Sequence, residues 1–270
     1  MAHGASSPEH TCWAYDDHQT FVLHARAFLH AGLTAGEQVW YVPGRRSSGV
    51  TGWLLDGAPD WPPGAVRVFD PQEVYSAAGA FDPVAQLTAY MAATQDAVAA
   101  GFRGLRVVAD ATAMVRTRPQ LDAFVRYEYA IGRYMRTAPL SALCVYDRTE
   151  LGDRAVAELA CVHRRTNAGH VPFQMYPGRT ARDTVLTGEV DGSAEDLFAT
   201  VLERAELHPV AGEVVVHAEE LGFITHRGLL ALQRHAERRE LTVVIRTPLR
   251  TVAPMVGALG LTGIRVESLG

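Results

Sequence analysis

Polar side chains that can bind or react follow three of the apolar runs in this 270-residue chain. They are Cys12, Tyr15, Asp110, Tyr146 and Arg148. If the runs are parallel strands, their carboxyl ends meet at one edge of a sheet, which is where ligands bind in open α/β folds. We therefore expect these side chains to line a ligand-binding region.

Metal binding is one alternative for this region, because His10, Cys12 and His163 could combine with Cys144 or Cys161. The His-x-Cys spacing is not usual for zinc, however, and a mid-strand Cys144 is typical of a small buried side chain. A pocket for an organic ligand needs only apolar walls and a few polar anchors. We favour that pocket, keep a purely structural role open, and expect neither a metal nor a cofactor.

Composition excludes several classes of enzyme. All 25 basic residues are arginine, so the chain has no lysine for a Schiff base or a phosphate-binding loop. The run after the first strand, residues 13–18, carries two carboxylates that would repel phosphate. A Cys12–His163 nucleophile pair would lack an orienting third group and an oxyanion hole. We expect no enzyme activity, and an enzyme with residual nucleotide chemistry remains the alternative.

The balance of charge and hydrophobicity limits the partners and the location. A net charge of -5 with scattered arginines gives no face suited to nucleic acid. No apolar run approaches the length of a membrane span. Three cysteines without paired spacing and a polar start favour a reduced, cytoplasmic protein. We expect no direct nucleic-acid contact and no membrane contact.

Strand-like and helix-like runs alternate along the chain, which predicts an α/β fold with a mainly parallel sheet. We expect an irregular loop over residues 45–64 and a domain boundary near residue 180, giving domains at 8–178 and 181–270. The expected strands of the first domain are 10–15, 38–42, 66–69, 105–110 and 142–148, and its expected helices are 19–30, 82–100 and 120–135.

Short motifs in the first domain resemble the MEDS sensory domain, first described in a dichloromethane-responsive regulator and in methanogen proteins. The matching pieces are His10-x-Cys12-x-x-Tyr15, Gly32-Leu33-x-x-Gly36-Glu37, Tyr127-Glu128, Leu143-Cys144-x-Tyr146-Asp147-Arg148 and His163. The resemblance implies a RecA-like fold and the sensing of small molecules such as hydrocarbon derivatives. Together with the strand ends, it gives the candidate ligand-binding set: His10, Cys12, Tyr15, Asp110, Glu128, Tyr146, Arg148 and His163. We expect Asp147 and Arg148 to form a structural ion pair or hydrogen-bond network.

The second domain resembles a STAS domain, the fold of anti-sigma factor antagonists. Its turn at residues 222–230 joins a strand-like run to a helix-like run, as in that family. The family usually carries Asp and a phosphorylated Ser where this chain has Thr225 and His226, and Arg227 follows. A serine kinase cannot modify His226, so the usual phosphoacceptor is missing. The other matching runs are the strands 186–191, 213–217 and 241–245 and the helices 196–205 and 248–259.

These features together predict a cytoplasmic signalling protein involved in transcription regulation. The MEDS-like domain would bind a small-molecule ligand, and the STAS-like domain would bind an anti-sigma factor of the GHKL kinase type or a related regulator. The surface at Thr225, His226 and Arg227 is the expected contact with that partner. A passive scaffold with both sites degenerate is the remaining alternative.

Overall fold

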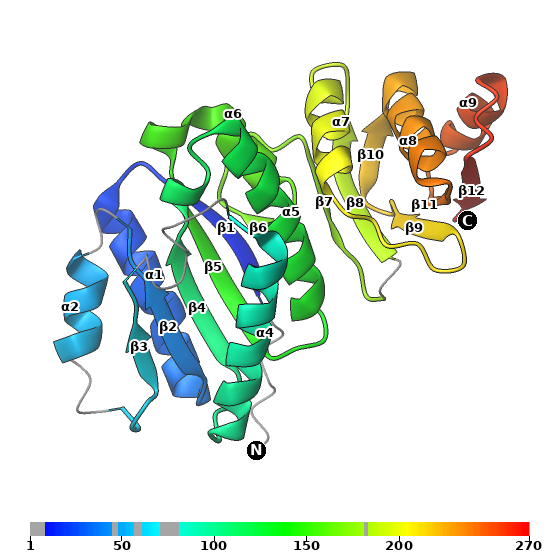
Figure 1. Ribbon diagram of the computed structural model, residues 1–270. Helices are drawn as coiled ribbons and strands as arrows, with labels where there is room; N and C mark the ends of the chain where they lie inside the picture. Colours follow the sequence, from blue (N-terminus) through cyan, green and yellow to red (C-terminus); the bar gives the residue numbers. More distant parts are fainter. Residues whose placement is uncertain (1–8, 45–47, 57–60, 71–80, 181–182, 270) are drawn as a thin grey trace.

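The computed structural model describes residues 9–44, 48–56, 61–70, 81–180 and 183–269. Two sheets with flanking helices lie side by side, and the second unit follows the first along the chain (Figure 1). This confirms the α/β fold, with a parallel-sheet domain preceding a smaller α/β unit. No helix in the described part is long and apolar enough to cross a lipid bilayer.

The first sheet is parallel throughout, in the order β3-β2-β4-β5-β1-β6. Its central strands β4 and β5 are buried along their whole length, as expected for a sheet covered on both faces. The strands are β1 (His10–Tyr15), β2 (Gln38–Val42), β3 (Val66–Val68), β4 (Leu105–Asp110), β5 (Leu140–Asp147) and β6 (Arg165–Thr166).

Helices cover both faces of this sheet. One face carries α1 (His18–Ala35) and α2 (Ser48–Asp56), and the other carries α4 (Pro83–Ala99), α5 (Arg118–Met135) and α6 (Arg148–Ala160). A short 3-10 turn, η2 (Thr112–Met114), follows β4. The start of α5 is fixed by a capping box, in which Thr117 and Gln120 bond each other's backbone N–H groups.

The second sheet has the order β10-β8-β9-β11-β12, and β7 pairs antiparallel with β8. Its strands are β7 (Phe173–Pro177), β8 (Asp183–Val190), β9 (Glu213–His217), β10 (Leu221–Ile224), β11 (Thr242–Thr247) and β12 (Ile264–Ser268). Its helices are α7 (Glu195–Arg204), α8 (His226–Arg239) and α9 (Val252–Ala258). The strand β7, expected in the first domain, therefore belongs to the second sheet; the exact boundary near residue 180 stays a prediction.

Two sequence-based expectations are wrong in detail. Within the supposed loop at 45–64, residues 48–56 form the helix α2, because Val50 and Leu54 are fully buried and pack into the core beneath α1. The expected strand 142–148 ends at Asp147, whose side chain caps α6 by accepting a hydrogen bond from Thr149 N. Arg148 is consequently the first residue of a helix and not the end of a strand.

The helix α5 is the structural link between the two units. A single continuous hydrophobic core runs from β4 and β5, through α5, to β8 and α7. On α5, Phe124 and Ile131 border the first sheet, and Tyr129 reaches Thr184 of β8. The helix α5 is therefore packed against both units.

Candidate functional site

Four side chains with metal- or ligand-binding atoms converge in the core of the first unit. They come from three elements and one turn: His10 from β1, Glu128 from α5, Cys144 from β5 and His163 from the turn after α6. Their donor atoms all lie within 4.8 Å of one another. We call these four residues the His-Glu-Cys cluster.

The pairing of β1 with β5 explains how this cluster assembles. His10 is in register with Ala142, and Cys12 with Cys144, so the two strands run side by side. Alternate residues on a strand face the same side, which places His10 and Cys144 on the face that α5 covers. Residue 128 on that helix then supplies a carboxylate between them.

Glu128 is the centre of the polar contacts. Its Oε2 lies 2.9 Å from His10 Nε2, 3.4 Å from His163 Nε2 and 3.5 Å from Cys144 Sγ. Its Oε1 accepts a hydrogen bond of 2.6 Å from the hydroxyl of Tyr146. The side chains of Glu128 and His163 are completely buried, so water competes with none of these contacts.

Burial and charge act against each other in this cluster. Burial alone would raise the pKa of Glu128, but the charge of His163, together with the hydrogen bond and charge of His10, prevails and holds it well below its usual range. Burial, followed by the charge of His163, lowers the pKa of His10 to about 4. Burial and the nearby Glu128 raise the pKa values of Cys144 and Tyr146 well above normal. The cluster therefore holds an ionised carboxylate among neutral Cys and Tyr side chains.

An apolar cavity of about 20 Å³ adjoins the cluster, with Glu128 and Cys144 in its wall. The other lining residues are aliphatic or aromatic, among them Tyr90, Phe124 and Ile131. This volume is about the room that one water molecule needs. An organic ligand of even a few carbon atoms would have to enlarge the cavity by moving α5 or α4.

A much larger hollow, of about 1390 Å³, lies on the surface elsewhere and contains none of the cluster residues. It is open, and two of the arginines that line it are paired with carboxylates, Arg106 with Glu37 and Arg165 with Glu9. The hollow therefore lacks the converging buried polar groups that mark the cluster as a candidate site.

The remaining sequence candidates are distributed over three other places. Tyr15 donates a 3.0 Å hydrogen bond to Asp110 at the carboxyl ends of their strands, on the face that α1 covers. Cys12 is fully buried in the core between β1 and α5. Arg148 turns toward Asp153, 3.8 Å away, while Asp147 takes part in a hydrogen-bond network with Thr149 and Thr112.

The structure thus brings together four of the eight candidates, His10, Glu128, Tyr146 and His163. It adds Cys144, which the sequence placed in the core as an inert side chain. The missed signal was the spacing of Cys144 and Tyr146: two residues apart on one strand, they share a face. The same rule separates Tyr15 from His10, because their positions differ by an odd number.

Comparison with known families decides where the first unit belongs. The family model described as "MEDS: MEthanogen/methylotroph, DcmR Sensory domain" matches residues 9–164, more than half of the chain. The chain belongs to the MEDS family. The matched range contains all four residues of the His-Glu-Cys cluster and most of the first sheet, so the cluster lies within the MEDS domain of this chain.

Comparisons beyond the MEDS domain are sparse. No curated protein matches the chain. Among solved structures, it is similar to the anti-sigma factor antagonist SpoIIAA in its unphosphorylated form, at 19% identity and a TM-score of 0.27. That similarity covers 36% of this chain and 88% of SpoIIAA.

Hydrogen bonds hold the turn between β10 and α8 in the second unit. The Thr225 hydroxyl accepts from Gly228 N at 3.1 Å, which caps α8, and donates to Glu195 at 2.7 Å. Arg227 pairs with the same carboxylate at 3.3 Å, and His226 is exposed. A phosphate on Thr225 would meet the charge of Glu195, which opposes phosphorylation at this hydroxyl.

Proposed function

We propose that this protein is a ligand-responsive regulator, in which the MEDS domain senses a small molecule and the second unit binds a regulatory protein. The His-Glu-Cys cluster with its apolar cavity is the proposed sensing site. The protein binds and signals in this proposal, and it does not turn its ligand over.

The observation that carries the proposal is the position of α5 between the two units. Glu128 on this helix is the centre of the cluster, and the next residue, Tyr129, forms a buried 2.8 Å hydrogen bond with Thr184 of β8. In this proposal, a ligand enlarges the small cavity by displacing α5, which forms part of the cavity wall. That displacement would alter the contacts of Tyr129 with the second unit. A ligand shifts the balance between two conformations only if it interacts differently with them, and the altered contacts would provide that difference.

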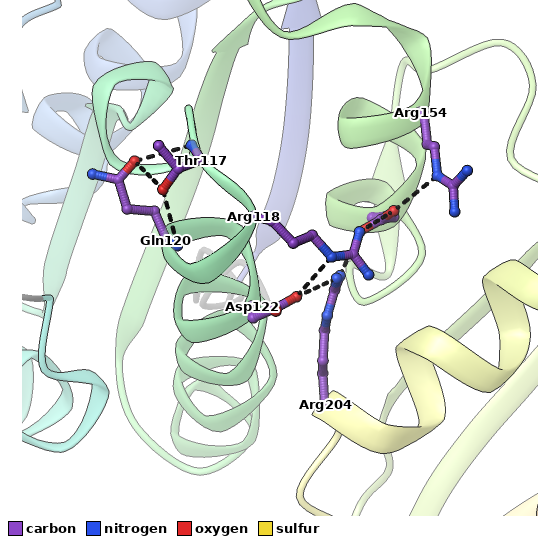
Figure 2. A network of polar contacts seen from close by, with 7 residues as sticks. Thr117, Arg118, Gln120, Asp122, Arg154 and Arg204 are labelled. Carbon is purple, nitrogen blue, oxygen red and sulfur yellow. Dashed lines mark hydrogen bonds and ion pairs between the residues drawn. The ribbon is translucent and has the colours of Figure 1, made fainter.

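A buried ion-pair network adds a second connection between the units. Arg204 at the end of α7 contacts Glu158 of α6 at 2.6 Å and Asp122 of α5, and Arg118 contacts Glu158 at 2.8 Å (Figure 2). Arg204 and Glu158 are almost completely buried. Buried charges are costly without their partners, so the network holds the two units in one relative position.

The proposed partner of the second unit is an anti-sigma factor or a related regulator. The support is the STAS-like order of strand, turn and helix at residues 222–230, where Phe223, His226 and Arg227 are exposed. Phe223 adds an exposed aromatic group to the charged side chains of this proposed contact surface. Regulation in this proposal comes from the MEDS domain, since the usual phosphoacceptor serine is replaced by His226.

The coupling can be tested without knowing the ligand. Hydrogen–deuterium exchange would be compared between the full chain and its Glu128→Gln variant, which removes the central charge of the cluster. We expect faster exchange in β8 and α7 as well as in β1 and β5. The matched control is Tyr15→Phe, which removes a buried hydrogen bond from the other face of the same sheet. If Glu128→Gln changes exchange only within the MEDS domain, the proposed coupling is wrong.

A further inference from the structure

The environment of His163 requires a positive charge beside its Nε2 atom. Its Nδ1 lies 2.8 Å from the carbonyl oxygen of Leu159, so Nδ1 carries the proton and donates. Its fully buried Nε2 has no hydrogen-bond partner among the described residues and lies 3.4 Å from Glu128 Oε2. A lone pair facing a carboxylate is repulsive in a buried site. Either Nε2 carries a second proton, or a cation lies between the two atoms.

The spacing of the donor atoms distinguishes these two possibilities. In a tetrahedral zinc site, bonds of about 2.0–2.1 Å to N or O and about 2.3 Å to S place the ligand atoms about 3.3–3.6 Å apart. Here the measured separations are 3.4 Å for His163–Glu128, 3.5 Å for Cys144–Glu128 and 3.7 Å for Cys144–His10. Only the His10–Glu128 distance, 2.9 Å, is that of a direct hydrogen bond. All four donor atoms lie within 4.8 Å of one another, so a bound ion would draw the longer separations in to tetrahedral spacing.

The partners of the cluster orient the ligand atoms in the way that metal sites require. Metal-binding histidines usually donate the remaining ring N–H to a carbonyl or carboxylate, as His163 does to Leu159. Tyr146 donates to Oε1 of Glu128 and leaves Oε2 directed at the other three ligands. These contacts are the outer hydrogen bonds that fix metal ligands in place.

We propose that His10, Glu128, Cys144 and His163 form a binding site for a divalent transition metal, with Zn²⁺ as the preferred ion. One thiolate and two imidazoles exclude Mg²⁺ and Ca²⁺, which take oxygen ligands, and suit Zn²⁺. A carboxylate and a thiolate also neutralise the two charges of the ion, so the completed site is neutral in the core.

A bound metal ion would change the charge state of Cys144. A thiol that coordinates a divalent ion loses its proton. Metal binding would therefore release a proton and replace the hydrogen bonds around Glu128 by coordination bonds.

Co²⁺ alone is the probe that tests the site, since it occupies zinc sites and is coloured. The full chain would be stripped with a chelator and titrated with Co²⁺. We expect one ion per chain, visible absorption of the intensity typical of tetrahedral Co²⁺, and a near-ultraviolet band from thiolate-to-cobalt charge transfer. Zn²⁺ should then displace Co²⁺ and abolish both signals.

Two serine variants identify the thiolate. Cys144→Ser should lose the charge-transfer band, and Cys161→Ser should keep it, because Cys161 is an equally buried thiol outside the cluster. Tyr146→Phe, which removes an outer hydrogen bond, should weaken Co²⁺ binding about 10- to 100-fold without changing the spectrum.

Three results would overturn the proposal: wild-type chain that binds less than one Co²⁺, an octahedral spectrum, or a charge-transfer band that survives Cys144→Ser. Each would contradict a tetrahedral site that uses the Cys144 thiolate. The inference does not rest on the signalling role. A chain that binds Co²⁺ here and shows no coupling between its units would retain the metal site and lose the proposed function.

Discussion

Glu128 and Tyr129 are consecutive residues of α5, and their side chains bind to different units of the protein. Glu128 Oε2 lies 2.9 Å from His10 in the MEDS domain, and the Tyr129 hydroxyl lies 2.8 Å from Thr184 Oγ1 in the second sheet. Successive positions on a helix point about 100° apart, so a helix between two layers can serve both. One peptide unit therefore joins the candidate site to the interface.

Tyr129→Phe should destabilise the full chain, because it leaves the buried Thr184 hydroxyl without its partner. The expected cost is about 1–3 kcal/mol in the free energy of unfolding, measured with urea. Adding Thr184→Val removes the unpaired hydroxyl, so the double variant should lose less than the sum of the two single variants. Additive losses would show that the two hydroxyls do not depend on each other.

Arg204→Met should be more damaging than the loss of an exposed arginine. It removes the contacts of one buried guanidinium with Glu158 and Asp122, for an expected loss of about 3–5 kcal/mol in unfolding free energy. Arg265→Met is the control, since Arg265 pairs with Glu213 and Glu267 at the surface and should matter little. Similar losses for both variants would mean that Glu158 keeps a sufficient partner in Arg118.

The same network predicts a dependence of stability on pH. Burial alone would raise the pKa of Glu158, but the hydrogen bonds and charges of Arg204 and Arg118 prevail and lower it. Arg154 also contacts this carboxyl, and Asp122 shares Arg204 with it. A carboxyl with a lowered folded pKa stabilises the protein above its unfolded pKa of about 4.3, and this stabilisation is lost as the pH falls through the folded pKa.

The Glu158→Gln variant isolates the contribution of this carboxyl to the pH dependence of stability from that of the other carboxyls. Between about pH 6 and about pH 3, the unfolding free energy of wild type should fall more steeply than that of the variant. The slopes of the two profiles should differ at the acidic end of this range and be equal near neutrality. Parallel pH profiles for the two proteins would contradict the assignment to Glu158.

Gly132→Ala tests the closeness of α5 to the cluster. A Cβ at this position would lie 3.0 Å from His10 Nδ1, tighter than an ordinary contact, so His10 must move. We expect weaker Co²⁺ binding and lower stability. Gly52→Ala in α2 is the matched control: its Cβ has no atom within 4 Å in the described residues, and it should stabilise the chain by about 0.5–1 kcal/mol. Unchanged Co²⁺ affinity in Gly132→Ala would show that His10 is free to shift.

The alternation of apolar runs was sufficient to predict most elements, because burial of both faces of a parallel sheet leaves strands such as 105–110 almost entirely apolar. The helix α2 was missed for a related reason. Its glycines and serine are typical of a loop, and only the burial of Val50 and Leu54, a tertiary effect, overrides them.

The site was harder to predict than the fold. The strand-end rule led to Asp110 and Tyr15, whereas the cluster lies in the interior, between sheet and helix. Glu128 and His163 were predicted as ligand-binding residues from the family motifs alone, because the sequence of a helix or turn does not identify the side chain that points into a site. Cys144 is buried within a strand as expected, but its contact with Glu128 was not expected, because a cysteine in an apolar strand usually has no polar partner.

The burial of α5 on both sides has a practical consequence for expression. The MEDS match ends at residue 164, but a chain cut there would leave Val125, Tyr129 and the rest of that helix face in water. Such a fragment should aggregate or recruit a substitute for the missing sheet. We therefore expect the border of the sequence family to be a poor place to divide this folded protein.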